Sequence, residues 1–212
     1  MVLSRRMPLQ NRVTPFGDIV ALDGRGLLMG NRGILHDARR RIVRYARGRR
    51  WIACLTRYRN RRRELMRPGS YTELFFLDEA TALAAGHRPC AECRRTEYTR
   101  FVAAWTACFP GAPASADAID RRLHADRMAG RGLKRTYTED IGRLPEGTYV
   151  AVDGAPWLLW DGALLAWSAG GYTERRPLLR GVVTVLTPRC LVAVVRAGYA
   201  PAVHPTATTR SG

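Results

Sequence analysis

The sequence predicts an α+β fold, and three observations support this class. β-rich runs with turn signals occupy most of the chain before residue 78, helical spacing of apolar residues appears between 96 and 128, and short β segments return from about residue 145. We therefore expect an N-terminal part of strands and short helices (1–110), a helical connection (111–144), a small antiparallel β-rich part (145–205) and a frayed tail (206–212).

The N-terminal segments are justified by local patterns. Residues 16–35 predict two strands joined by an Asp-Gly turn. The arginine-rich residues 36–50 predict either a short basic helix or an arginine-coated connection. Residues 51–66 predict two strands around an Arg-Asn-Arg turn, and the run "SYTELFFL" at 70–77 predicts a further strand.

Three helices follow from capping residues and apolar spacing. Residues 78–86 form a short helix with Asp78 as N-cap and Gly86 as its stop. Aromatic and apolar residues at three- and four-residue steps predict a helix over 96–109, and Ser115 is the expected cap of a helix over 116–128. The segments 148–172 and 181–199 predict the C-terminal antiparallel sheet, with Cys190 between two of its strands.

The charge of the chain indicates a polyanionic partner. The formal net charge is +17, and Lys134 is the sole lysine, so the cations are almost entirely arginines. Arginine binds phosphate in a bidentate manner and stacks on bases, and such a surplus favours nucleic acid as the partner. No apolar run approaches the ~20 residues of a membrane span, and the start lacks the apolar segment of a secretory signal. We therefore expect a cytoplasmic protein without a membrane partner.

Two of the five cysteines form a Cys-x-x-Cys motif, Cys90 and Cys93. A persistent disulfide is not expected in the cytoplasm, which leaves a redox motif or a metal-binding knuckle. A redox pair commonly begins a helix after a strand, whereas this pair follows a helix end and a Pro89 turn, which favours the knuckle. A zinc site needs two further ligands.

The stretch "LFFLDEATALAAGHRPCAECRR" resembles the zinc-binding N-terminal domain of Ada-type bacterial DNA alkylation-repair proteins. The resemblance covers residues 71–95 and rests on Phe75, Phe76, the run 82–86 and the Arg-Pro-Cys-x-x-Cys motif at 88–93. It implies that Cys90 and Cys93 are the second half of a four-cysteine zinc site. In that family the first half is a cysteine pair, one member of which accepts a methyl group from a DNA phosphotriester. This chain has only Cys54 upstream, which places the methyl-acceptor activity in doubt.

The remaining metal ligands are sought among Cys54 and two histidines. Cys54 and His36 would complete a Cys₃His set, and the zinc ion would be structural, because four protein ligands leave no position for water. His87 has suitable spacing but occupies the position of an aromatic residue in the Ada-type family, which favours packing over the helix end. Cys54 also suits a buried β face as a small hydrophobe, and Cys108 and Cys190 are expected in the core.

Arginines crowd residues 39–63 and flank the Cys-x-x-Cys motif, and Tyr45, Trp51 and Tyr58 are interleaved as rings that could stack on bases. The predicted nucleic-acid contacts are Arg49, Arg50, Arg57, Arg59, Arg61, Arg62, Arg63, Arg88, Arg94 and Arg95. Asp120 and His124 lie four residues apart, either as a surface ion pair or as a pair that serves general-base or metal chemistry.

The expected function is that of a zinc-containing nucleic-acid-binding protein, with DNA preferred over RNA, linked to DNA repair or regulation. One alternative is a metal-dependent nuclease or another nucleic-acid-processing enzyme. The other is an interaction module whose arginines contact an acidic protein.

Overall fold

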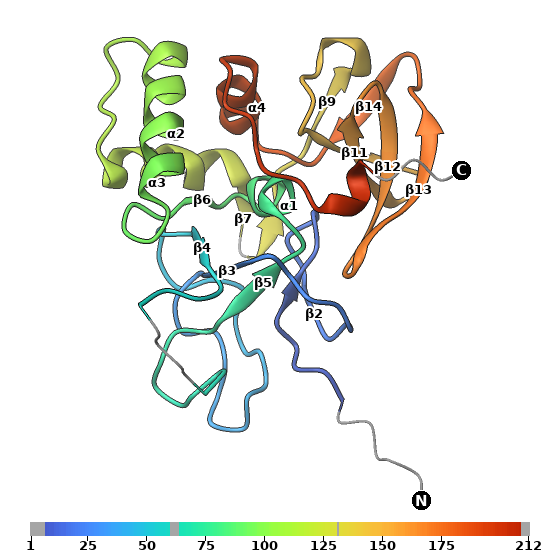
Figure 1. Cartoon of the computed structure of the whole chain (residues 1–212). Helices are drawn as coiled ribbons and strands as arrows, with labels where there is room; N and C mark the ends of the chain where they lie inside the picture. Colours follow the sequence, from blue (N-terminus) through green and yellow to red (C-terminus); the bar gives the residue numbers. More distant parts are fainter. Residues whose placement is uncertain (1–6, 60–63, 131, 209–212) are drawn as a thin grey trace, which may run out of the picture.

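The computed structural model describes residues 7–59, 64–130 and 132–208. It contains four α-helices, two six-stranded sheets and a two-stranded sheet among these residues, so the α+β class is confirmed. The N-terminal sheet and its long loops lie on one side of the molecule, and the helices and the C-terminal sheet lie on the other (Figure 1). Within the described residues, no helix has the length and apolar character needed to cross a membrane.

The N-terminal sheet is assembled from very short strands. Its order is β2 (Ile19–Val20), β1 (Arg12–Val13), β5 (Leu74–Phe76), β3 (Leu28–Asn31), β4 (Ile52–Leu55) and β6 (Arg88–Pro89). One face of the sheet packs into a core that includes Leu28, Leu74, Phe76, Ala82 and Ala85. Alternation of side chains along each strand then leaves the opposite face outside this core.

The structure corrects two expectations in this region and decides between the alternatives of a third. β2 pairs with β1 rather than with β3, so residues 16–35 do not form the predicted hairpin. Residues 36–50 form the arginine-coated connection rather than the basic helix, and this connection includes a single β-bridge between His36 and Ile42. Only β4 is found in the described part of 51–66, because Thr56 onward turns away from the sheet; residues 60–63 lie outside the described range.

The three predicted helices are confirmed as α1 (Glu79–Ala84), α2 (Arg95–Cys108) and α3 (Ala116–Arg127). Asp78 caps α1 by accepting a hydrogen bond from the Thr81 N–H, and Ser115 caps α3 through the Ala118 N–H. Gly86 ends α1 at φ +85°, a left-handed conformation that glycine adopts without a side-chain penalty.

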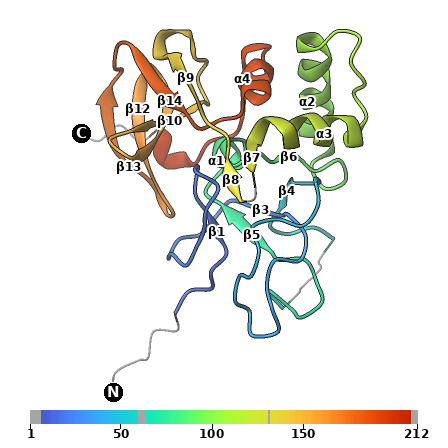
Figure 2. The same cartoon turned by 180° about the vertical axis from the view of Figure 1, so that it is seen from behind.

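The C-terminal sheet is antiparallel, as expected, and it recruits a strand from the predicted helical connection. Its order is β13 (Gly171–Pro177), β12 (Ala163–Ser168), β11 (Ala155–Trp160), β10 (Tyr149–Val152), β14 (Val182–Val185) and β9 (Tyr137–Asp140). Between α3 and β9 lies a small hairpin of β7 (Met128–Gly130) and β8 (Leu133–Lys134). The hairpin projects toward the N-terminal sheet (Figure 2). Two short 3-10 helices, Ile141–Arg143 and Pro205–Ala207, complete the fold.

The expected strand before Cys190 is found as β14, but the expected strand after it is wrong. Residues 189–196 form α4 (Arg189–Arg196), which begins after Pro188 and buries Leu191, Val192, Val194 and Val195. The carboxylate of Asp126 in α3 accepts a hydrogen bond from the Cys190 N–H at 2.6 Å, so α3 satisfies a donor in the first turn of α4. Valine is weakly disfavoured in helices, and tertiary packing outweighs that preference here.

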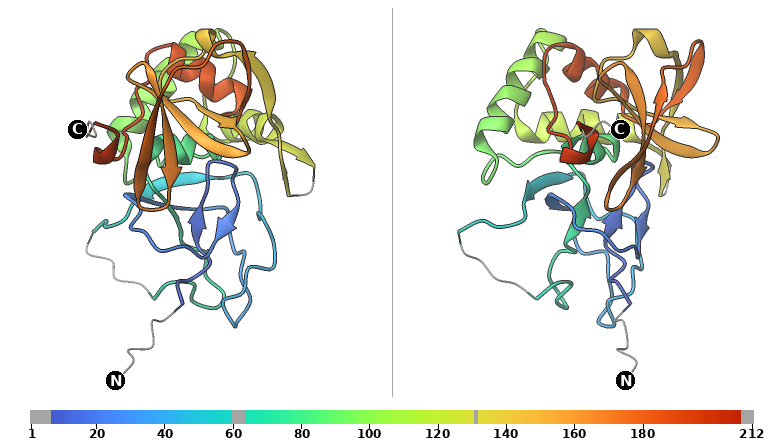
Figure 3. Two further views of the ribbon diagram at one scale, coloured as in Figure 1. Left: turned by 90° about the vertical axis from the view of Figure 1, so that its right-hand side faces the viewer. Right: turned by 45° about the vertical axis from the view of Figure 1, so that its right-hand side comes forward.

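The helices connect the two large sheets into one packed structure (Figure 3). α2, α3 and α4 share a core with Leu83 of α1 and with Tyr199, and the other face of α1 packs on the C-terminal sheet through Ala80 and Ala84. The buried Glu79 accepts hydrogen bonds from the Tyr199 hydroxyl and the Ala202 N–H, which anchors the C-terminal segment to α1.

Candidate metal centre and adjoining pocket

Three cysteines converge because of the strand register of the N-terminal sheet. β4 and β6 pair in parallel with Ala53 opposite Pro89, and the Cys90 N–H donates to the Ala53 carbonyl at 2.9 Å. This register places Cys54 and Cys90 side by side. A turn closed by a hydrogen bond from the Arg94 N–H to the Cys90 carbonyl brings Cys93 back toward them. The three sulfur atoms lie within 4.8 Å of one another, and they could hold a metal ion.

The surroundings of the sulfurs suit thiolate ligands. The Glu92 N–H donates to the Cys90 sulfur and the Leu55 N–H donates to the Cys93 sulfur, each at 3.4 Å. The Cys54 thiol donates a hydrogen bond to the Cys90 sulfur. This hydrogen bond raises the pKa of Cys54 and lowers the pKa of Cys90 to about 5. Burial raises the pKa of Cys93. Cys90 is therefore the first of the three to ionise.

The geometry fits a tetrahedral ion with small adjustments. Metal–sulfur bonds of ~2.3 Å place sulfurs ~3.8 Å apart, which is compatible with three sulfurs that all lie within 4.8 Å of one another. Among the described residues, no fourth cysteine, histidine or carboxylate belongs to the group. Within the described residues, the group therefore offers three possible ligands, one fewer than the expected structural site requires.

Neither candidate histidine belongs to this group. The prediction that His36 is a ligand is corrected, because its Nδ1 bonds to Thr72 Oγ1 at 2.6 Å and its Nε2 lies 3.2 Å from the Arg67 carbonyl. His36 holds together the loops that flank the sheet. His87 is fully buried between the rings of Trp51 and Phe76, in agreement with its expected packing role.

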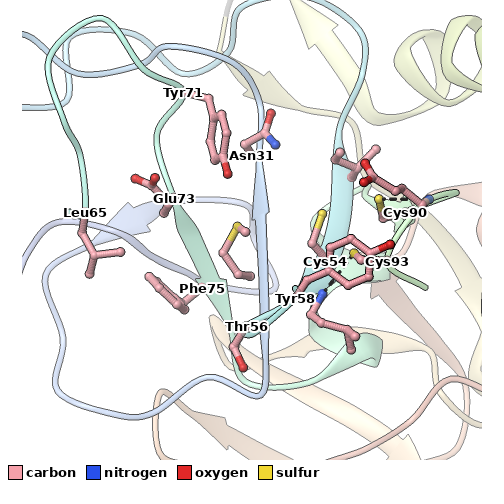
Figure 4. A pocket seen from close by; sticks show the side chains of 14 residues that line it. Asn31, Cys54, Thr56, Tyr58, Leu65, Tyr71, Glu73, Phe75, Cys90 and Cys93 are labelled. Atoms are coloured by element: carbon pink, nitrogen blue, oxygen red, sulfur yellow. Dashed lines mark hydrogen bonds between the residues drawn. The ribbon is translucent and has the colours of Figure 1, made fainter. Parts of the chain in front are cut away.

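A half-enclosed pocket of about 300 Å³ adjoins the three cysteines (Figure 4). It lies over the face of the N-terminal sheet that does not join the core. Phe75, Met29 and Cys54 form a row across β5, β3 and β4, because Met29 is the register partner of both neighbours. The remaining walls carry two tyrosines, two carboxylates and an amide, and include Asn31, Tyr58, Tyr71, Glu73 and Glu92.

The structure divides the predicted nucleic-acid contacts into three groups. Arg49, Arg50, Arg57, Arg59 and Arg95 are exposed. Arg61, Arg62 and Arg63 lie outside the described residues. The assignment of Arg88 and Arg94 to a nucleic-acid surface is corrected, because both side chains are about 95% buried and form ion pairs with Asp120 at 2.7 Å and with Glu79 at 2.9 Å. Their guanidinium groups hold α3 and α1 in place.

Two further candidates have structural roles. Trp51 is 1% exposed, and the guanidinium groups of Arg32 and Arg127 stack on it at 4.2 and 4.0 Å, so it presents no ring for stacking on a base. Asp120 binds Arg88 with both oxygens, and His124 Nδ1 instead lies 3.3 Å from Arg127 Nη2. Asp120 and His124 therefore do not form the considered general-base pair.

The pocket residues Asn31, Tyr71 and Glu73 did not emerge from motifs. One signal was available in "SYTELFFL", where alternation puts Tyr71, Glu73 and Phe75 on one face and Thr72, Leu74 and Phe76 on the other. A charged residue between two aromatic ones on a single strand face indicates a surface that is neither core nor ordinary solvent-exposed sheet.

Comparison of the chain with protein-family models, curated proteins and solved structures finds no match. The resemblance to the Ada-type zinc domain therefore stays a prediction that rests on residues 71–95 alone.

Proposed function

We propose that the protein is a zinc-containing nucleic-acid-binding protein in which Cys54, Cys90 and Cys93 hold the ion. The observation that carries the proposal is the convergence of these three sulfurs beside exposed arginines. Arg57 follows Cys54 by three residues and Arg95 follows Cys93 by two. A metal ion would fix the loop after β4 to the turn before α2, and with them the arginines that contact phosphate.

The distribution of ion pairs supports a phosphate-binding role for these arginines. The interior residues Arg88 and Arg94 are neutralised by buried carboxylates. By contrast, within the described ranges neither Arg57 nor Arg95 has a carboxylate at ion-pair distance. Unpaired surface cations on a chain of net charge +17 favour an anionic polymer. The preference for DNA over RNA and the role in repair or regulation are what the resemblance of residues 71–95 to the Ada-type domain implies.

Metal content tests the first half of the proposal. Elemental analysis of the purified protein should give about one zinc per chain, as four-coordinate sites do. Cys54→Ser and Cys93→Ser should each lose most of the zinc. Cys108→Ser is the matched control, because the Cys108 thiol bonds to the Ala193 carbonyl at the α2–α4 contact. Full zinc retention in Cys54→Ser would remove that residue from the site.

Salt-dependent binding tests the second half. The affinity for labelled DNA and RNA is measured by fluorescence anisotropy for the wild type, for Arg57→Glu/Arg95→Glu and for Arg143→Glu/Arg180→Glu. The control pair makes the same change of charge at exposed positions in the C-terminal region. We expect the first pair to lower affinity at least about tenfold and to reduce the salt slope, with little effect from the control. Equal losses in both pairs would contradict a defined surface, and binding to an acidic protein instead of nucleic acid would support the interaction module.

A second candidate is a metal-dependent enzyme acting on nucleic acid. The specific observation in its favour is the pocket beside a three-thiol set, since three protein ligands leave one coordination position for an outside group. This candidate would be supported if the protein cleaves or modifies an oligonucleotide only in the presence of zinc. Cys54→Ser should then lose the activity, and Cys108→Ser should keep it.

A further inference from the structure

We infer that the pocket beside the cysteines binds a single unstacked nucleobase that offers N–H donors, such as guanine or cytosine. The inference deepens the proposed nucleic-acid binding and rests on it for the identity of the ligand. It depends on the shape of the pocket, on one buried carboxylate and on the arginines at the rim.

The walls of the pocket suit a flat ring. Phe75 and Met29 form its floor on the sheet, and both are only half-buried, whereas their strand neighbours Leu74, Phe76 and Leu28 are buried in the core. Tyr58 and Tyr71 extend from the two loops that border the sheet (Figure 4). Aromatic rings and a thioether provide stacking surfaces for a base without regard to its sequence context. A cavity of about 300 Å³ accepts one ligand of this size.

A buried carboxylate provides the selectivity. Glu73 is 4% exposed, and one of its oxygens accepts a hydrogen bond from the Met66 N–H at 2.8 Å. Among the described residues, no cation forms an ion pair with Glu73. The Met66 N–H occupies one of the roughly four acceptor positions of the carboxylate, so Glu73 keeps the capacity to accept further hydrogen bonds. The amino and imino groups of guanine and the amino group of cytosine are suitable donors.

The surroundings of the pocket match the rest of a nucleotide. Arg57 and Arg59 lie on either side of Tyr58, and Arg67 lies between Leu65 and Tyr71 in the sequence. All three arginines are exposed, so they can meet backbone phosphates while the base enters the pocket. Asn31 adds an amide to the polar wall that includes Glu73. The ligand is thus a base from a single strand, or one extruded from a duplex, rather than a paired base.

The first test measures the base-dependent affinity of the full-length protein for strands of about eight nucleotides whose flanking positions are all abasic. Each strand carries a central guanine, cytosine or abasic site. We expect the guanine and cytosine strands to bind about tenfold more tightly than the abasic strand, and we expect this difference between the strands to disappear in Glu73→Gln. Glu146→Gln is the matched control, because Glu146 also accepts a backbone N–H, from Gly162 at 3.0 Å, but lies in the C-terminal region. The amide oxygen that Glu73→Gln introduces can still accept from the Met66 N–H, and thermal unfolding checks that the variant folds.

The second test uses guanosine monophosphate and saturation-transfer NMR, and it does not require binding of a polymer. The pocket assignment is supported if saturation is transferred from the protein to the guanine H8 proton, and if this transfer is lost in Glu73→Gln and kept in Glu146→Gln. If strands bind through Arg57 and Arg95 with equal affinity for guanine and abasic centres, the inference fails and the proposed function stands. If no strand binds but the nucleotide signal depends on Glu73, the proposed function fails and the pocket assignment stands. Absence of base dependence in both tests overturns the inference.

Discussion

The ion pair between Arg88 and Asp120 gives the sharpest test of the structure, because the sequence places Arg88 on a nucleic-acid surface and the structure places it inside. Arg88 Nε and Nη2 donate to the two carboxylate oxygens at 2.9 and 2.7 Å, and the side chains are 5% and 2% exposed. Asp120→Asn leaves the guanidinium group buried without its counter-charge. We expect a loss of about 3–5 kcal/mol in the free energy of unfolding.

The loss is measured by urea unfolding followed by tryptophan fluorescence, and two variants make the result specific. Asp161→Asn removes the charge of Asp161 from its exposed ion pair with Arg175, in which the side chain of Asp161 is 64% exposed and that of Arg175 is 34% exposed. This change should lower the free energy of unfolding by less than about 1 kcal/mol. The double change Arg88→Met/Asp120→Leu replaces the pair with apolar groups and should recover most of the stability. If Asp120→Asn lowers the free energy of unfolding no more than Asp161→Asn does, the pair of Arg88 and Asp120 is not buried. Arg88 would then belong to the exposed surface that the sequence predicts for it.

Three further outcomes follow from named contacts. Metal affinity should fall by about a hundredfold for each unit by which the pH is lowered, over the range where binding displaces two thiol protons. Cys54 and Cys93, whose pKa values are raised, are the expected sources of these protons, and a competition titration against a chromophoric chelator that gave the same affinity at every pH would contradict this. Burial and the neighbouring cations Arg32, Arg127 and Lys134 hold the pKa of His87 well below its usual value, so the unfolded chain takes up the proton first. The free energy of unfolding should therefore fall by about 1.4 kcal/mol per pH unit below about pH 6.5, and His87→Phe should remove this slope in acid unfolding titrations; an unchanged slope would assign it to another group. Gly86→Ala combines a left-handed φ of +85° with a Cβ position 2.6 Å from Arg127 Cδ, whereas Gly111→Ala has φ +76° and no atom within 4 Å. Conformation alone should cost each variant roughly 1–2 kcal/mol, and thermal unfolding should show a larger loss for Gly86→Ala; equal losses would mean that Arg127 moves aside.

Local signals predicted the elements that depend on nearby residues. The caps Asp78 and Ser115, the stop at Gly86 and the apolar spacing of α2 act within a few residues, and all were found where expected. The C-terminal helix α4 was missed because its valine-rich residues also fit a strand, and its first turn is capped by Asp126 from another helix. Strand pairing in the N-terminal sheet was predicted poorly for a similar reason, since strands of two to four residues have little pattern of their own.

The sequence by itself determined the α+β class, the cationic character and the pairing of Cys90 with Cys93 in one turn, because composition and short-range spacing are sufficient for these properties. Only the tertiary structure decided which other side chains join them. Parallel pairing of β4 with β6 brought Cys54 to the two cysteines, whereas hydrogen bonds to Thr72 and Arg67 hold His36 elsewhere. Burial likewise separated the arginines that brace the fold from those that face solvent, and it depends on contacts with carboxylates far apart in the chain.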